Sequence, residues 1–204
     1  DRYASRGLGD VYKRQFPHGG NEVFTYAGKY ETGVKRGGKF VIAGVSTYEG
    51  EFDGGGEMTG KGKRTWVDGR VYEGDFVKGE QTGYGRWEKN GTHFLTGEKS
   101  YECYEGDFVD NVRQGQGTYT DGKFTYTGLF SNHKFNGAAT VTGKDDKDGS
   151  FTMKGAFLEN KILGKADVTY FTEGTPESVL QCDTWQEGQP TGIGSYIALQ
   201  SEYV

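Results

Sequence analysis

A short motif that recurs along the chain is the feature that most constrains its fold. The segment YEGDFVKGEQTGYGRW, residues 72–87, is the clearest copy. Repeats with a period of roughly 20–50 residues predict stacked, similar units that each bury little surface alone. Neighbour-to-neighbour packing, rather than one central core, is then expected to stabilise the chain. Seven copies are predicted, and they start at Tyr26, Tyr48, Tyr72, Tyr104, Tyr126, Met153 and Gln181.

The spacing inside one copy predicts β-strands. Tyr72, Gly74 and Phe76 are two residues apart, so in a strand they lie on one face, with Glu73 and Asp75 on the other. The second half of the copy alternates in the same way. Each copy is therefore expected to form a β-hairpin with one face of aromatic residues and glycines and one polar face.

Turn signals separate the expected hairpins. Residues 77–82 are expected to link the two strands of a hairpin. Asn-Gly and Asp-Gly dipeptides supply the positive φ that tight turns require, and they follow second strands at Asp68-Gly69, Asn90-Gly91, Asp121-Gly122 and Asp148-Gly149. No segment has a helical period. The predicted fold class is all-β, an elongated single-layer antiparallel meander of stacked β-hairpins.

The glycine content needs a packing reason. The chain has 36 glycines in 204 residues, against an average of about 7%, and glycine inside a strand is normally unfavourable. Aromatic residues are also frequent, with 14 Tyr, 13 Phe and 3 Trp. We expect the ring of one repeat to lie over Gly74 or Gly85 of its neighbour, where no side chain blocks it.

The repeat resembles that of the MORN-repeat family, whose unit is similar to YxGxFxxGxxxGxGxxxxxxG, over about residues 26–196. The resemblance implies a sheet of hairpins that acts as a scaffold or adaptor. Family members occur in cytoskeletal and ciliary assemblies, at membrane contact sites, and as regulatory regions of lipid kinases or lysine methyltransferases. Protein binding, phospholipid binding and dimerisation are the roles attributed to the repeats.

The N-terminal segment departs from the repeat. Residues 1–15 contain no initiator Met and resemble a translated sequencing-library adaptor. We therefore exclude them as an adaptor-derived or disordered segment; a native basic tail is the alternative. A single repeat domain is predicted over residues 16–204.

The leading functional hypothesis is a non-enzymatic scaffold whose aromatic, glycine-lined face binds a protein partner, either a helix or an extended peptide. The alternative for each of these rings is that it only packs against other rings. The residues expected to contact the partner are Phe52, Trp66, Tyr72, Phe76, Trp87, Tyr104, Phe108 and Tyr119.

Two other functions stay open at this point. The chain could act as a membrane-associating module that binds anionic phospholipid, and the predicted contacts are then the cations of the first repeat, Lys29, Lys35, Arg36 and Lys39. It could also be the regulatory repeat region of a larger enzyme. A second copy of the chain, giving a homodimer, is a further candidate partner.

The polar face has an acidic pattern of its own. Glu49 and Glu51, and their equivalents in the next two strong copies, would form an acidic lane beside Lys61 and Lys63. One interpretation is a solvated face with cross-strand ion pairs. The other is a docking lane for a basic partner.

Charge and composition exclude several classes of function. A net charge of −5 argues against nucleic acid, whose binders usually present a basic stripe. The three histidines and two cysteines are scattered, so we predict no metal site, no cofactor and no catalytic residues. Cys103 and Cys182 lie in different repeats and are expected to be free thiols, which suits a cytoplasmic location. The resemblance further implies association with the cytoskeleton or a membrane.

Overall fold

The structure is a computed structural model that describes residues 14–18, 22–92, 99–144, 149–172, 175–182, 185–186, 189–190 and 195–198. This part of the chain forms β-strands joined by turns and contains no helix. The chain divides into two compact units. Unit 1 comprises Asp1–Lys99 and Phe108–Asn111, and unit 2 comprises Ser100–Asp107 and Val112–Val204.

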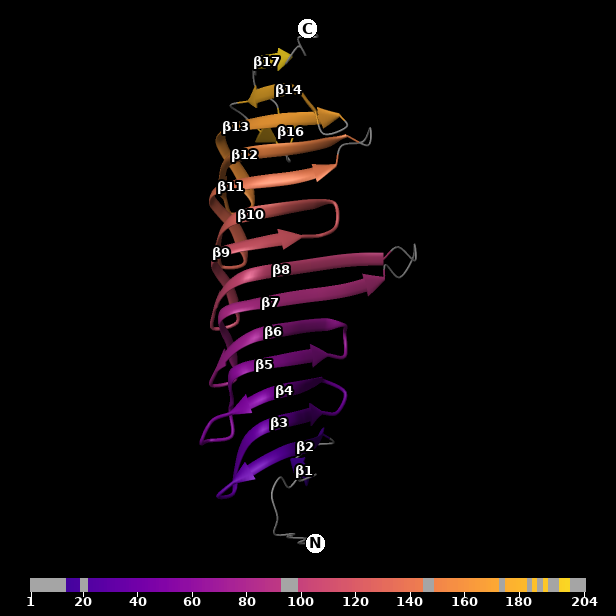
Figure 1. Ribbon diagram of the computed structural model, residues 1–204, viewed down its shortest axis with the longest axis vertical. Helices are drawn as coiled ribbons and strands as arrows, with labels where there is room; N and C mark the ends of the chain where they lie inside the picture. The colour runs from indigo at the N-terminus through magenta and orange to yellow at the C-terminus, as the bar shows by residue number, and fades with distance from the viewer. Residues whose placement is uncertain are drawn as a thin grey trace. The chain divides into compact units, whose positions relative to one another are not determined.

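Within each unit, hydrogen-bonded neighbours follow chain order as far as β14 (Thr175–Cys182) (Figure 1). Unit 1 contains β1 (Arg14–His18), β2 (Glu22–Glu31), β3 (Val34–Ile42), β4 (Ser46–Phe52), β5 (Met58–Trp66), β6 (Arg70–Val77) and β7 (Glu80–Thr92). Strand β8 (Lys99–Val109) contributes residues to both units. Unit 2 contains β9 (Val112–Thr120), β10 (Phe124–Ser131), β11 (Lys134–Lys144), β12 (Ser150–Leu158), β13 (Lys161–Thr172), β14 (Thr175–Cys182), β15 (Trp185–Gln186), β16 (Gln189–Pro190) and β17 (Ser195–Ala198). Strand β14 pairs with β17, while β15 and β16 pair with each other in a separate sheet.

The predicted all-β meander of antiparallel hairpins is confirmed. Of the segment predicted to lie outside the domain, residues 1–13 are not among the described residues. Arg14 and Gln15 form the first two residues of β1 and pair with Tyr26 and Thr25 of β2. The first described strand therefore starts two residues before the predicted boundary.

The hairpins are tighter than predicted. Strands β6 and β7 are linked by Lys78 and Gly79 alone, and both residues have positive φ, at 50° and 83°. Two positive φ angles define the turn whose twist matches that of paired strands. The predicted six-residue link, 77–82, was wrong because most of it belongs to the strands. The same pair of positive φ angles occurs at Thr32–Gly33, Asp110–Asn111, Asn132–His133 and Glu159–Asn160.

The turns between hairpins are partly as predicted. Gly69 and Gly122 follow aspartates and have φ of 87° and 86°, as the Asp-Gly prediction requires. The prediction for Asn90-Gly91 was wrong, since both residues lie inside β7. Asp148, of the fourth predicted turn, lies outside the described residues.

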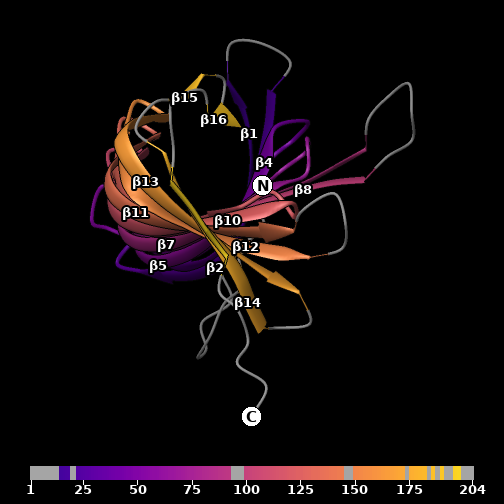
Figure 2. The same ribbon diagram turned by 90° about the horizontal axis from the view of Figure 1, so that it is seen from above.

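A β-bulge interrupts the β4–β5, β6–β7, β10–β11 and β12–β13 hairpins at the same place, directly after the glycine two residues beyond the repeat start. In the β2–β3 hairpin it falls one residue later. Gly74 pairs with Gly85, but the next residue, Asp75, pairs with Thr82, so β7 has two extra residues there. The first of them, Gly83, has φ of +57°, which explains the first glycine of the GxG motif. Bulges bend a strand and increase its twist, and Figure 2 shows curved strands in each unit.

The second glycine of GxG makes room for a ring of its own hairpin. A Cβ atom at Gly74 would lie 2.6 Å from the Tyr72 hydroxyl, and a Cβ at Gly85 would collide with the same ring. The Tyr72 hydroxyl donates to the Asp75 carbonyl at 3.0 Å and lies 3.3 Å from that of Thr82. The expectation that the ring of a neighbouring repeat covers these glycines was therefore wrong.

The tyrosines and phenylalanines form a buried ladder, which we call the Tyr–Phe ladder. Tyr48 contacts Phe52 of its own hairpin and Phe76 of the next, edge to face, with centroids 5.3 and 5.1 Å apart. Tyr72 repeats this arrangement with Phe76 and Phe108. Such geometry is favourable for aromatic pairs. The ladder comprises Tyr26, Tyr48, Phe52, Tyr72, Phe76 and Phe108 in unit 1, and Tyr104, Tyr126, Phe130 and Phe157 in unit 2.

Four hairpin turns, at Gly79, Asn111, His133 and Asn160, also bind the hairpin before them. The Asn111 backbone N–H donates to the Gln81 carbonyl at 2.9 Å, and its side-chain oxygen accepts the Gln81 N–H at 2.9 Å. Asn160 makes the same two contacts with Phe135. Turn residues with a left-handed backbone and a short polar side chain are suited to this, because asparagine tolerates that conformation.

The predicted copies differ in how fully they form this unit. The five tyrosine starts are buried, each with its hydroxyl on the carbonyl three residues later. Met153 is half-buried in β12, and Gln181 is exposed in β14. The weak last two copies therefore lack the tyrosine contact, and the count of seven stays a prediction.

Gly85→Ala is expected to destabilise the fold by about 1–3 kcal/mol, because the added methyl group overpacks a site filled by the Tyr72 ring. Urea denaturation measures the loss. Gly54→Ala is the matched control: a Cβ there meets no atom within 4 Å, so the change should stay within about 0.5 kcal/mol. Equal stability of the two variants would contradict the assigned role of Gly85.

The buried hydroxyls predict alkaline sensitivity. Burial, with the charge of Glu51 added, raises the pKa of Tyr48 from 10.0 to about 12. The unfolded chain therefore loses this proton first, and stability present below pH 10 falls as the pH rises towards 12. The melting temperature of wild type should fall further over this range than that of Tyr48→Phe. Other tyrosines and lysines titrate in both proteins, so the difference between the curves isolates Tyr48; parallel curves would contradict the prediction.

Candidate functional site

The ring face of each unit, the face that bears the Tyr–Phe ladder, is covered by side chains from the second strand of every hairpin. Five of the predicted partner-binding residues belong to the ladder itself: Phe52, Tyr72, Phe76, Tyr104 and Phe108, which are at most 5% exposed. These rings have almost no surface left for a partner. The three others, Trp66, Trp87 and Tyr119, are half-buried and remain accessible.

In unit 1, the first line of accessible side chains crosses the hairpins opposite the tyrosines. Phe40 pairs with Tyr48, which pairs with Arg64. Arg64 pairs in turn with Tyr72, which pairs with Trp87. We call the accessible members, Phe40, Arg64 and Trp87, the Arg64 row.

The register also shows which residue is equivalent to Trp87 in the preceding hairpin. Trp66 pairs with Ser46, two residues further along β5, so Arg64 rather than Trp66 takes the equivalent place. Trp66 instead lies beside two guanidinium groups, those of Arg64 at 4.8 Å and Arg70 at 5.2 Å from the indole ring.

A second line of side chains, of which Gln81 is buried at 8% exposure, lies opposite the phenylalanines. Met58 pairs with Phe52, and Gln81 pairs with Phe76. Lys35 occupies the same position in the first hairpin. We call Lys35, Met58 and Gln81 the Lys35 row. The carbonyls of Met58 and Gln81 each accept an N–H from the turn of the following hairpin, which holds this row in place.

The sequence did not predict the Lys35 row as a set: Lys35 was expected to contact lipid, and Met58 and Gln81 were not named. Its members fall inside the stretch of each repeat that was expected to be a six-residue link. The two-residue turn places them in the second strand instead. The available signal was position nine after Tyr26, Tyr72, Tyr104 and Tyr126, where the residue changes from Lys to Gln, Arg and Phe while the motif around it persists. Met58 lies ten residues after Tyr48, because that copy has an extra residue in its turn.

In unit 2 the equivalent positions are mostly apolar. Phe135 stacks on Tyr126 with centroids 3.9 Å apart and planes within 8°. The Arg113 guanidinium lies 5.5 Å from the Tyr104 ring and 5.8 Å from that of Tyr119. Val141 is 7% exposed, so this part of the ring face offers less polar contact than that of unit 1.

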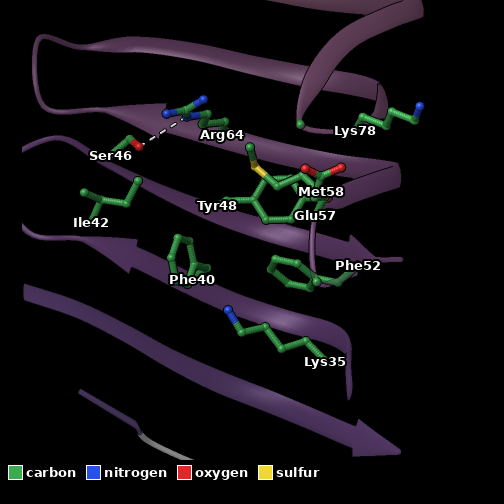
Figure 3. A pocket seen from close by; sticks show the side chains of 12 residues that line it. Lys35, Phe40, Ile42, Ser46, Tyr48, Phe52, Glu57, Met58, Arg64 and Lys78 are labelled. Atoms are coloured by element: carbon green, nitrogen blue, oxygen red, sulfur yellow. Dashed lines mark hydrogen bonds between the residues drawn. The ribbon is translucent and has the colours of Figure 1, made fainter. Parts of the chain in front are cut away.

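A hollow of about 180 Å³ opens on the ring face of unit 1 (Figure 3). Phe40, Ile42, Tyr48 and Phe52 supply its apolar lining. The charged side chains at its rim are three cations and one carboxylate, from Lys35, Arg64, Lys78 and Glu57. An apolar site rimmed by a few charges is the usual form of a binding site.

Arg64 is the central charged residue of this surface. Its Nε donates to the Ser46 hydroxyl at 3.2 Å. Burial, followed by repulsion from Arg70, lowers the pKa of Arg64, although a guanidinium stays charged at any physiological pH. The charge is therefore held where water solvates it less well than in the open.

Lys35 is also held against rings. Its ammonium lies 4.5 Å from the centroid of Phe40, and 5.2 and 5.6 Å from those of Tyr26 and Phe52. Cations over aromatic faces are attracted to the ring quadrupole. Burial lowers the pKa of Lys35, so the fold itself disfavours its charge.

The four cations predicted to contact lipid do not gather on one surface. Lys35 lies on the ring face, while Lys39 pairs with Glu49 on the opposite, outer face at 2.8 Å. Arg36 lies in the bulge and pairs with Glu31 at 3.2 Å. Lys29 pairs with Gly37 and is exposed.

The outer face of unit 1 is a network of cross-strand ion pairs. Lys61 lies 2.7 Å from Asp75, and Lys63 lies 3.4 Å from Glu73. The carboxylate of Asp75 also accepts the N–H of Tyr84 in the bulge, at 3.3 Å. The acidic lane therefore has structural partners, which favours the interpretation of a solvated, paired face.

The described residues show few features of other kinds of site. They contain no group of three or more His, Cys, Asp or Glu side chains placed to hold a metal ion. In the same part of the chain there is no helix with the length and apolar character needed to cross a bilayer. Cys103 is a free, buried thiol.

Comparison with known proteins agrees with the repeat register. The family model described as MORN repeat matches residues 48–69, 72–91 and 104–124. Alsin from Rattus norvegicus is 34% identical over 99 residues, which cover 39% of this chain and 6% of that protein. Alsin from Mus musculus and from Homo sapiens are each 33% identical over 99 residues with the same coverage. The similarity thus spans only a small part of these much longer relatives.

Lys35→Met should leave the stability unchanged within about 0.5 kcal/mol or raise it. Its pKa is lowered in the folded state, so at neutral pH the charge opposes folding. Lys39→Met is the matched control on the outer face of β3, where loss of the Glu49 pair should cost up to about 1 kcal/mol. Urea denaturation measures both. A clear loss for Lys35→Met would make this lysine structural.

Proposed function

From the premise that this chain is a MORN-repeat protein, we propose that it is a non-enzymatic interaction scaffold whose ring face binds a helix or an extended peptide of a protein partner. MORN repeats occur in protein- and membrane-interacting modules. The observation that supports a protein partner is the Arg64 row, which places accessible aromatic and cationic side chains above a ladder already packed without a partner.

Aromatic and arginine side chains at a surface favour protein recognition. Trp, Tyr and Arg dominate the energetics of protein interfaces because they combine large apolar area with directional polar groups. Trp87 and Arg64 lie on hydrogen-bonded strands and the backbone carbonyl of Met58 accepts an N–H from a turn, so little backbone entropy remains to be lost on binding. A scaffold with half-buried anchors on a fixed backbone suits a partner that folds onto it.

The membrane alternative has less support. A surface that binds anionic lipid needs its cations on one face, whereas Lys35 and Lys39 lie on opposite faces and Arg36 and Lys39 are paired. The regulatory alternative draws on the relatives, in which the similar region is 6% of a longer protein.

Trp87→Ala tests the proposal directly. Peptides would be selected from a random display library on the immobilised full chain and then rebound to variants. We expect Trp87→Ala to lose binding while its stability falls by well under the about 3–5 kcal/mol expected for Phe76→Ala, whose ring is 1% exposed.

Tyr84→Ala is the matched control, since Tyr84 is an aromatic of the same strand that is 54% exposed and lines the outer face. It should keep full binding. Selected peptides that bind Trp87→Ala as well as wild type, or that lose binding to Tyr84→Ala, would reject the ring face as the binding surface.

A further inference from the structure

We propose that the partner segment bound by the ring face of unit 1 is acidic, with a carboxylate facing Arg64 between two apolar side chains that lie over Phe40 and Trp87. This inference rests on the proposed function and specifies the chemistry of its partner. It is carried by the order of side chains along the Arg64 row and by the charge of the hollow beside it.

The row alternates in chemistry at a fixed spacing. One strand lies between consecutive members of the row: Tyr48 pairs with both Phe40 and Arg64, and Tyr72 pairs with both Arg64 and Trp87. Neighbouring strands lie about 4.8 Å apart, so consecutive members of the row are about 10 Å apart. A partner chain that crosses the hairpins therefore meets an aromatic side chain, a cation and an aromatic side chain in turn.

Arg64 has hydrogen-bonding capacity to spare. A guanidinium has five N–H donors in a fixed fork, and among the described residues one of them, on Nε, is used, by the Ser46 hydroxyl. The Arg64 Cζ also lies 4.8 Å from the centroid of the Trp66 ring, a cation–π contact that uses none of these N–H donors in a hydrogen bond. A carboxylate is the group that best fits such a fork, because it can accept two parallel N–H bonds.

The charge of the hollow favours the same partner. The whole chain has a net charge of −5, yet the hollow is rimmed by Lys35, Arg64 and Lys78 against the carboxylate of Glu57. A local positive surface on an acidic protein attracts acidic segments and repels basic ones. An anion near Lys35 would also offset the burial that lowers its pKa.

The cations on the two faces of β5 differ in their partners. Lys63, next to Arg64 in sequence, points to the outer face and lies 3.4 Å from Glu73. Lys61 is paired with Asp75 at 2.7 Å. The cations of the outer face thus have carboxylate partners within the chain, whereas Arg64 is placed against an alcohol and a ring.

The test uses three pools of short fluorescein-labelled peptides and the full chain. The pools share their apolar positions, filled with Leu and Phe, and differ only at the polar ones, which are Asp and Glu, Asn and Gln, or Lys and Arg. Anisotropy at physiological salt gives the affinities. We expect the acidic pool to bind at least about tenfold more tightly than the neutral pool, and the basic pool to bind most weakly.

Matched variants then locate the charge. Arg64→Gln should weaken the acidic pool about tenfold and leave the neutral pool unchanged, while Arg64→Lys should recover part of the loss, since it keeps the charge without the fork. Lys63→Gln makes a similar change of charge one residue away, on the outer face, and should have little effect. Lys35→Gln and Lys39→Gln form a second pair on β3. Lys35→Gln, on the ring face, should weaken the acidic pool, and Lys39→Gln, on the outer face, should have little effect.

The outcomes separate this inference from the function on which it rests. Equal binding of the acidic and neutral pools, lost in Trp87→Ala, would overturn the acidic partner and keep the scaffold. Equal effects of Arg64→Gln and Lys63→Gln would also overturn it, by showing a general charge effect. Binding of no pool would reject both, and so would binding to phosphatidylserine vesicles in place of peptides.

Discussion

The contact between a tyrosine ring and a pair of glycines is the constraint on which the rest of the structure depends. The Tyr72 ring lies where the side chains of Gly74 and Gly85 would otherwise be, and its hydroxyl reaches the backbone of the bulge beyond them. The ring excludes a side chain at Gly85, and at Gly74 the ring and the Gly85 backbone exclude one together. The bulge that it reaches requires Gly83 at a positive φ, so ring, glycines and bulge form one unit that recurs with the repeat.

Burial of the rings of the Tyr–Phe ladder decides which residues stay accessible to a partner. Phe76 touches both Tyr48 and Tyr72, so the ladder passes from one hairpin to the next without a gap within unit 1. A fold that packs its motif residues so completely leaves recognition to positions that the motif does not specify. Arg64 and Lys35 occupy such positions, which is how a repeated scaffold geometry can present a surface of its own chemistry.

Much of the fold could be predicted from the sequence. The two-residue alternation at Tyr72, Gly74 and Phe76 fixed the strands and their aromatic face, and Asp68-Gly69 marked a real turn. The hairpin link was misjudged because Lys78-Gly79 does not look like a typical turn pair, although two positive φ angles are present there. Alternation also fails across a bulge, where two extra residues break the pairing register, and sequence gives no direct sign of it.

The sequence by itself determined the repeat, the hairpins and the chemical identity of the two faces, because all three follow from spacing along one strand. Only the tertiary structure decided which aromatics are buried and which cations face the rings. Phe76 and Trp87 look equally available in the sequence, yet the neighbouring hairpin covers Phe76 and leaves Trp87 half-exposed. Lys35 and Lys39 look alike as well, and the bulge between them places one over Phe40 and the other beside Glu49. Contacts between hairpins depend on register, and register is set by bulges and turns across several strands.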